Sequence, residues 1–181
     1  MTATASPAAL CSHEARKLLQ RFLENKRLAA ELRQKAYLRL IGCTIVMVRH
    51  PGTFDKARNF ETAVTYHHAG RELLSIHGIR ERLAYNAAMI LRSKSERVVG
   101  RARSQPSNAS LDYVSAIRTL RYTIGVTGLG DPDMNELFAI VLAVLLGELT
   151  REQLIEMCIE SGNKWIVKVP GSHPKETLLD C

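Results

Sequence analysis

The feature that most constrains the fold is the stretch Ile79–Ser104, in which apolar and then basic residues recur at helical spacing. Steps of three and four residues from Ile79 to Leu91 connect apolar side chains. The same steps then reach three cations, Lys94, Arg97 and Arg101. Buried unpaired charges are costly, so this stripe cannot lie wholly in a dry core. The pattern predicts one basic helix whose second half is either solvated or holds anions.

Charge is distributed unevenly along the 181 residues, whose net charge is +7. Residues 1–103 carry 19 Lys and Arg against 8 Asp and Glu, whereas residues 110–181 carry 6 against 10. Arg outnumbers Lys by 17 to 8, and a guanidinium is the better bidentate ligand of phosphate. The composition therefore favours a polyanionic partner for the first half of the chain.

Two helical regions are predicted before Ile79. Ser12 is a candidate cap for one long helix, or two nearly collinear helices, that would end before His50-Pro51-Gly52. Thr53 or Asp55 would cap the next helix, with Gly78 at its carboxyl end. Within that helix His67 and His68 would point about 100° apart, without an acidic or cysteine partner at i+4. We interpret them as packed or surface histidines rather than metal ligands.

Residues 104–109 (SQPSNA) are uncharged and read as a linker, after which Ser110 would cap a helix over Leu111–Ile124. Arg121 falls within the apolar arc of that helix, with Arg118 beside it. Two interpretations of Arg121 remain open. It forms an internal salt bridge with Asp112 or a neighbouring helix, or it joins Arg118 in a second group of cations facing the anion.

The rest of the chain predicts two further helices and a tail. Following the glycine-rich turn GVTGLGD, Asp131-Pro132 or Asp133 would begin a buried helix containing Leu137–Leu149, with Glu136 available for a capping box. Thr150 and Gln153 form a second capping signature, for a helix that ends at Gly162. Lys164–Val169 resembles a strand but has no partner strand in this interpretation, so we expect an extended tail or a contact with another subunit.

These elements together predict an all-α fold of about six helices, in a bundle or in two small helical subdomains. The predicted organisation is a basic helical half at 1–103, a linker at 104–109 and a helical half with a tail at 110–181. The oppositely charged halves and the tail also predict a homo-oligomer.

Several classes of function are disfavoured by the sequence. The four cysteines have no paired spacing, and no signal peptide or membrane-spanning run is evident, so we expect a cytoplasmic protein. No catalytic constellation or metal-ligand pattern stands out. We expect a protein that is not an enzyme and has no cofactor, metal, membrane or small-molecule substrate.

Binding of RNA through its phosphates is the function that these patterns favour. Zinc-finger spacing and an aromatic RNP strand are both missing, and aromatic residues make up only 6% of the chain. Charge and shape remain as the means of recognition, for double- or single-stranded RNA. The alternative is a structural or adaptor protein that self-associates through its oppositely charged halves. The predicted RNA contacts are Arg80, Arg82, Arg92, Lys94, Arg97, Arg101, Arg103, Arg118 and Arg121.

The overall pattern resembles the small RNA-silencing suppressors of closteroviruses. The segments that carry the resemblance are AGRELL (Ala69–Leu74), RERLAYNAA (Arg80–Ala88) and LDYVSAIRTLRY (Leu111–Tyr122). The resemblance implies a viral protein that sequesters RNA in the host cytoplasm, without sequence preference and as a homo-oligomeric ring.

Overall fold

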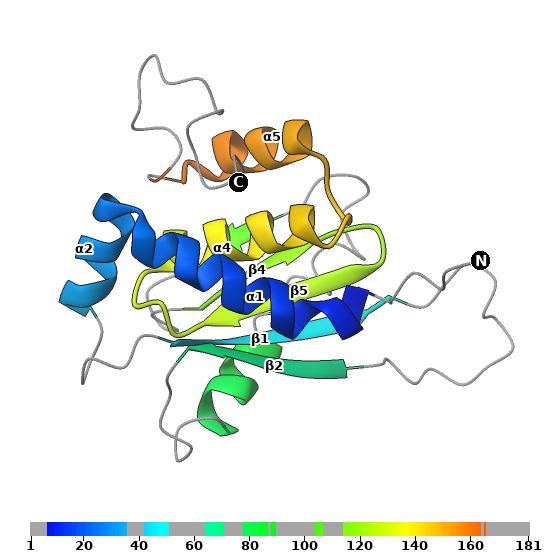
Figure 1. Cartoon of the computed structure of the whole chain (residues 1–181). Helices are drawn as coiled ribbons and strands as arrows, with labels where there is room; N and C mark the ends of the chain where they lie inside the picture. Colours follow the sequence, from blue (N-terminus) through cyan, green and yellow to red (C-terminus); the bar gives the residue numbers. More distant parts are fainter. Residues whose placement is uncertain are drawn as a thin grey trace, which may run out of the picture.

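A five-stranded antiparallel sheet is the centre of the fold (Figure 1). The computed structural model describes residues 7–35, 42–50, 64–70, 78–86, 88–89, 104–106, 114–163 and 165. The strand order is β2-β1-β5-β4-β3. The strands are β1 (Gly42–Arg49), β2 (Val64–Gly70), β3 (Ser104–Pro106), β4 (Val114–Arg118) and β5 (Tyr122–Thr127). The protein is therefore a mixed α/β protein, and the all-α prediction is wrong.

Strand β1 shows why the helical interpretation failed. The prediction continued a helix through this segment, but Thr44, Ile45, Val46 and Val48 are β-branched and favour extended backbone. Every residue of β1 from Gly42 to Val48 is buried. A strand covered on both faces reads as a continuous apolar run without alternation, so its period does not distinguish it from a buried helix.

The predicted helix between Thr53 and Gly78, at its described residues 64–70, and the predicted helix over Leu111–Ile124 are corrected in the same way. Strand β2 occupies Val64–Gly70 and pairs with β1. Strands β4 and β5 form a hairpin, in which the Thr119 N–H donates to the Tyr122 carbonyl oxygen at 2.8 Å. Isoleucines at 117 and 124 are opposite each other on neighbouring strands, although their spacing also fits a helix.

Helices α1 (Pro7–Glu24) and α4 (Pro132–Leu145) cover one face of the sheet, which we call the first face (Figure 1). Their aromatic rings meet at Phe22 and Phe138, with centroids 5.2 Å apart in an edge-to-face arrangement. Helix α2 (Lys26–Lys35) follows α1. The predicted cap at Ser12 is also wrong, because α1 begins earlier and the Ser12 hydroxyl instead contacts His67 Nδ1 at 2.8 Å.

The predicted starts of the two carboxyl-terminal helices agree with the structure, although α4 ends at Leu145 rather than at Leu149. Asp131 caps α4 and accepts hydrogen bonds from the backbone N–H groups of residues 133 and 134, with Pro132 as the first helical residue. In α5 (Arg151–Ser161), Thr150 and Gln153 form the reciprocal capping box, at 2.9 and 3.3 Å. Glu136 takes no part in the α4 cap, because its Oε2 instead accepts hydrogen bonds from Ser161 and Asn163.

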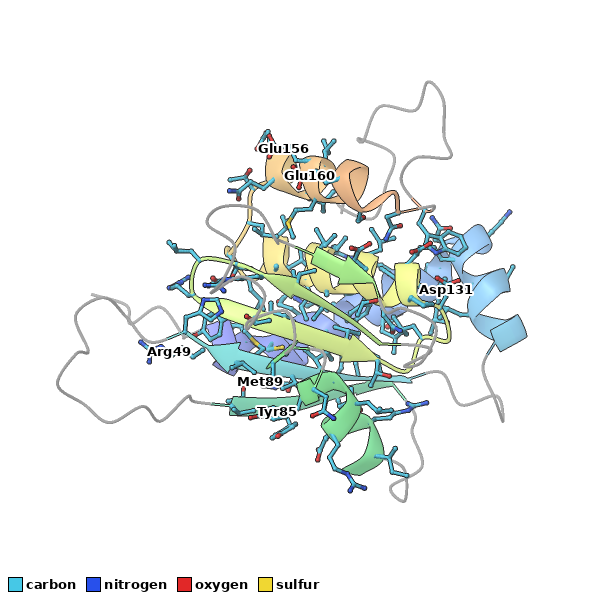
Figure 2. The ribbon with its side chains drawn as sticks, turned by 180° about the vertical axis from the view of Figure 1, so that it is seen from behind. Arg49, Tyr85, Met89, Asp131, Glu156 and Glu160 are labelled. Carbon is cyan, nitrogen blue, oxygen red and sulfur yellow. The ribbon has the colours of Figure 1, made fainter. Side chains whose placement is uncertain are left out.

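The opposite side of the sheet, called here the second face, is covered by a helix over residues 78–86 and 88–89. Ala84 and Ala88 pack on Val46 and Val48 of β1, with Tyr85 and Met89 beside them (Figure 2). Gly125 of β5 allows this close approach, since a Cβ there would overlap the Ala84 carbonyl oxygen.

The sheet combines strands from both of the halves that the sequence analysis separated. β1 and β2 come from the first half, and β5 of the second half pairs with β1. Residues 104–106, in the predicted linker, form β3 and pair with β4. Trp165 packs against the core, so this part of the predicted tail contacts its own chain. The other residues of Lys164–Val169 lie outside the described part.

Candidate nucleic-acid interface

Three paired residues, Val48, Thr123 and Arg118, form a row across the second face at the end of the sheet where β4 ends. Val48 pairs with Thr123, and Thr123 pairs with Arg118. Because side chains alternate along a strand and Ile117 points into the core of the first face, Arg118 points to the second face. His50 lies at the same end and contacts the Thr123 hydroxyl through Nε2, at 2.7 Å.

Arg80 and Arg82 lie at the other end of this face, near the start of the helix at 78–89. The Arg80 guanidinium donates to the Gly42 carbonyl oxygen at 3.3 Å, and the Arg82 Nε donates to the Gly78 carbonyl oxygen at 3.2 Å. Arg80 is half-buried and Arg82 is exposed. Arg82 is thus open to solvent for a ligand, whereas Arg80 also helps to hold the helix against β1.

Arg121 is held in an ion pair. It lies in the turn between β4 and β5, and its guanidinium is 2.6 Å from the carboxylate of Glu148. The Glu148 side chain is 1% exposed and also accepts a hydrogen bond from the Thr119 hydroxyl. The salt-bridge interpretation therefore describes Arg121, with Glu148 as the partner that the described residues show. Asp112 lies outside the described residues. The structure also corrects the placement of Arg118 and Arg121, which are not one helical turn apart.

The five remaining predicted contacts, Arg92, Lys94, Arg97, Arg101 and Arg103, lie outside the described residues, in what we call the basic segment, 90–103. The described residues at its two ends are nevertheless informative. Met89 packs in the cluster that contains Val48. Ser104 pairs with Ile117, the residue before Arg118. The chain thus enters and leaves the basic segment on either side of the row Val48–Thr123–Arg118.

His67 and His68 are adjacent in sequence but contact different parts of the fold. Because they are on a strand, they point to opposite faces rather than about 100° apart as on a helix. His67 contacts Ser12 of α1, while His68 lies between the Thr44 hydroxyl at 3.1 Å and the Glu81 carboxylate at 3.0 Å. Burial, and then the neighbouring His68, lower the pKa of His67. The described residues contain no group of three or more potential metal ligands.

One unusual titratable group was not identified from the sequence. Glu136 is fully buried, and its Oε2 accepts hydrogen bonds from Asn163 Nδ2 at 2.8 Å and Ser161 Oγ at 3.0 Å. Burial raises the pKa of this carboxyl to about 7, with a smaller contribution in the same direction from Asp133 and opposing ones from the two hydrogen bonds. In the sequence, Glu136 looks like an ordinary polar residue near the start of a helix, so its burial was not predicted.

Comparison with known proteins gives no assignment. No protein-family model matches the chain. No curated protein and no solved structure matches it either. Among the described helices, none combines the length and the hydropathy needed to span a bilayer.

Proposed function

We propose that this protein binds RNA through the phosphate backbone, with little sequence preference, and that the second face and the basic segment form the binding surface. The observation that carries the proposal is the position of the two ends of the basic segment. Met89 and Ser104 flank the row that ends in Arg118, and the chain between them contains five of the predicted cations. Phosphate contacts of this kind supply affinity without reading bases.

Differences among the predicted cations refine the proposed surface. Arg82 is exposed and Arg118 is half-exposed on the second face. Arg121 is assigned to the Glu148 ion pair and leaves the proposed surface, because its guanidinium already neutralises a buried carboxylate. Arg80 is assigned a mixed role, because it donates to the Gly42 carbonyl oxygen. The surface therefore consists of Arg82, Arg118 and the basic segment.

The salt dependence of binding tests this proposal. If about four phosphates are neutralised, log K falls with log salt at a slope of roughly −3 to −4. The double variant R97A/R101A should weaken binding by similar factors on unrelated RNA sequences, and should flatten the slope by roughly one to two units. Fluorescence anisotropy with short labelled RNA duplexes and single strands measures both quantities.

A matched control removes the same charge from the other side of the sheet. Arg16 and Lys17 are exposed on α1, which covers the first face. R16A/K17A should therefore keep most of the wild-type affinity. Equal losses in the two double variants would indicate a response to net charge alone. Wild-type affinity and slope in R97A/R101A would overturn the proposed surface.

We extend the proposal to sequestration of RNA from the silencing machinery as the biological role. This extension rests on the resemblance to closterovirus suppressors, and the all-helical pattern behind that resemblance is wrong. Of its three segments, RERLAYNAA is part of the helix on the second face, whereas LDYVSAIRTLRY includes β4 and the start of β5. The test is whether the protein suppresses silencing of a reporter gene and whether R97A/R101A loses that activity.

A further inference from the structure

The outer edge of strand β2 is a surface that the RNA proposal does not use. Among the described residues, β2 has a strand neighbour on its β1 side alone, because it ends the sheet order. An outer strand presents backbone N–H and C=O groups that can pair with another strand. Proteins usually protect such an edge by making it short or by placing proline, lysine or other charges in it.

The two edges of this sheet differ in that protection. β3, at one edge, has three residues and includes Pro106. β2, at the other, has seven residues, VTYHHAG, with no proline, lysine, arginine or acidic residue. It lies beneath α1 on one face and pairs with β1 along its whole length, so it is a regular strand held in place. Among the described residues, the longer and more regular edge strand is therefore the one that lacks these protective features.

We propose that β2 pairs antiparallel with β2 of a second copy of this chain, which forms a homodimer with a continuous sheet of ten strands. The strand is complementary to itself in this arrangement. With a two-fold axis normal to the sheet, the first face of one copy continues the first face of the other. The residue at the axis must then pair with the same residue of the second copy. Placed at the central residue, His67, the axis pairs all seven residues of β2.

The side chains fit this register on both faces. On the second face, Tyr66, which is 45% exposed, lies opposite His68 of the second copy, as an aromatic cross-strand pair. On the first face, Thr65 lies opposite Ala69, and both are small. The two His67 rings meet at the axis, where a lowered pKa favours their neutral form. No like-charged pair of Lys, Arg, Asp or Glu arises along the strand.

The dimer also has a geometric consequence for ligand binding. The same axis turns both second faces to one side of the joined sheet, so the two Arg118 residues face in one direction. The pairing itself does not depend on RNA, and it can be tested without RNA. Failure of the dimer therefore leaves the proposed RNA surface untouched, and failure of RNA binding leaves the dimer.

Sedimentation velocity of the full chain over a wide concentration range tests the pairing. The wild type should dimerise, and Y66K should raise the dimer dissociation constant roughly tenfold or more, because two lysines enter the joined edge. L120K is the matched control, since Leu120 is 90% exposed at the tip of the β4–β5 hairpin. It should dimerise like the wild type. A monomeric wild type, or Y66K with wild-type affinity, would overturn the proposal.

Hydrogen exchange keeps the test decisive if Y66K fails to fold. In the wild type, the amides of β2 that point away from β1 should become protected as concentration rises, while β3 shows no such change. Amide protection of β2 that does not change with protein concentration would contradict the pairing. So would a folded Y66K variant that still dimerises while L120K does not.

Discussion

Replacing Glu136 by glutamine should remove a large part of the pH dependence of stability. The folded-state pKa of about 7 lies above the ordinary value of 4.5, so the native state binds the proton more tightly than the unfolded chain. The corresponding stabilisation is fully present below about pH 4.5 and is lost as the pH rises through about 7. At about 1.36 kcal/mol per pKa unit, the loss amounts to roughly 3 kcal/mol.

In E136Q the amide mimics the protonated acid. Its oxygen can still accept the hydrogen bonds from Ser161 and Asn163. The variant should match the wild type near pH 4.5 and exceed its unfolding free energy by roughly 2–3 kcal/mol at pH 8. Urea unfolding, followed by fluorescence of the single tryptophan, Trp165, measures this difference. E160Q makes the same change at an exposed position of α5 and should not alter the profile (Figure 2).

Subtracting the E136Q profile from that of the wild type removes the contributions of other titrating groups. His67, for example, titrates in both proteins. If the two profiles remain parallel from pH 4.5 to 8, the carboxyl is not protonated in the folded state at neutral pH. Burial would then not raise the pKa of Glu136.

Two further substitutions test the packing on the second face and the ion pair at the β4–β5 turn. G125A should destabilise the fold by roughly 1–3 kcal/mol, because the added Cβ overlaps the Ala84 carbonyl oxygen and pushes the helix at 78–89 from the sheet. G78A, where nothing lies within 4 Å, should have little effect in the same urea titration. R121A should cost roughly 1–2 kcal/mol, because it leaves the buried Glu148 carboxylate without its cation. An effect no larger than that of K17A, which breaks the exposed 3.5 Å pair with Glu14, would refute this.

Local signals in the sequence predicted the elements whose boundaries depend on local contacts. Asp131-Pro132 and the Thr150–Gln153 pair fix helix starts through hydrogen bonds to nearby backbone, and Gly162 ends α5 with a positive φ of 69°. These features depend on few residues outside the segment, so α4 and α5 were predicted close to where they lie.

Strand pairing could not be predicted in the same way, because it depends on contacts distant in sequence. β1 reads as helix or strand until its partners β2 and β5 are known, since both of its faces are buried. The candidate site shows the same limit. The sequence identified the cations, but the salt bridge from Arg121 to Glu148 and the burial of Glu136 depend on tertiary packing.

The most direct test of the proposed binding surface is to map an RNA duplex onto the folded chain by NMR. Amide chemical shifts are recorded as a short duplex is added. We expect the largest changes at Arg118, at Thr123 and along the helix on the second face (78–86 and 88–89), and little change at Arg16 and Lys17 on α1. Changes concentrated on α1, or no changes at saturating RNA and low salt, would contradict the proposed binding surface.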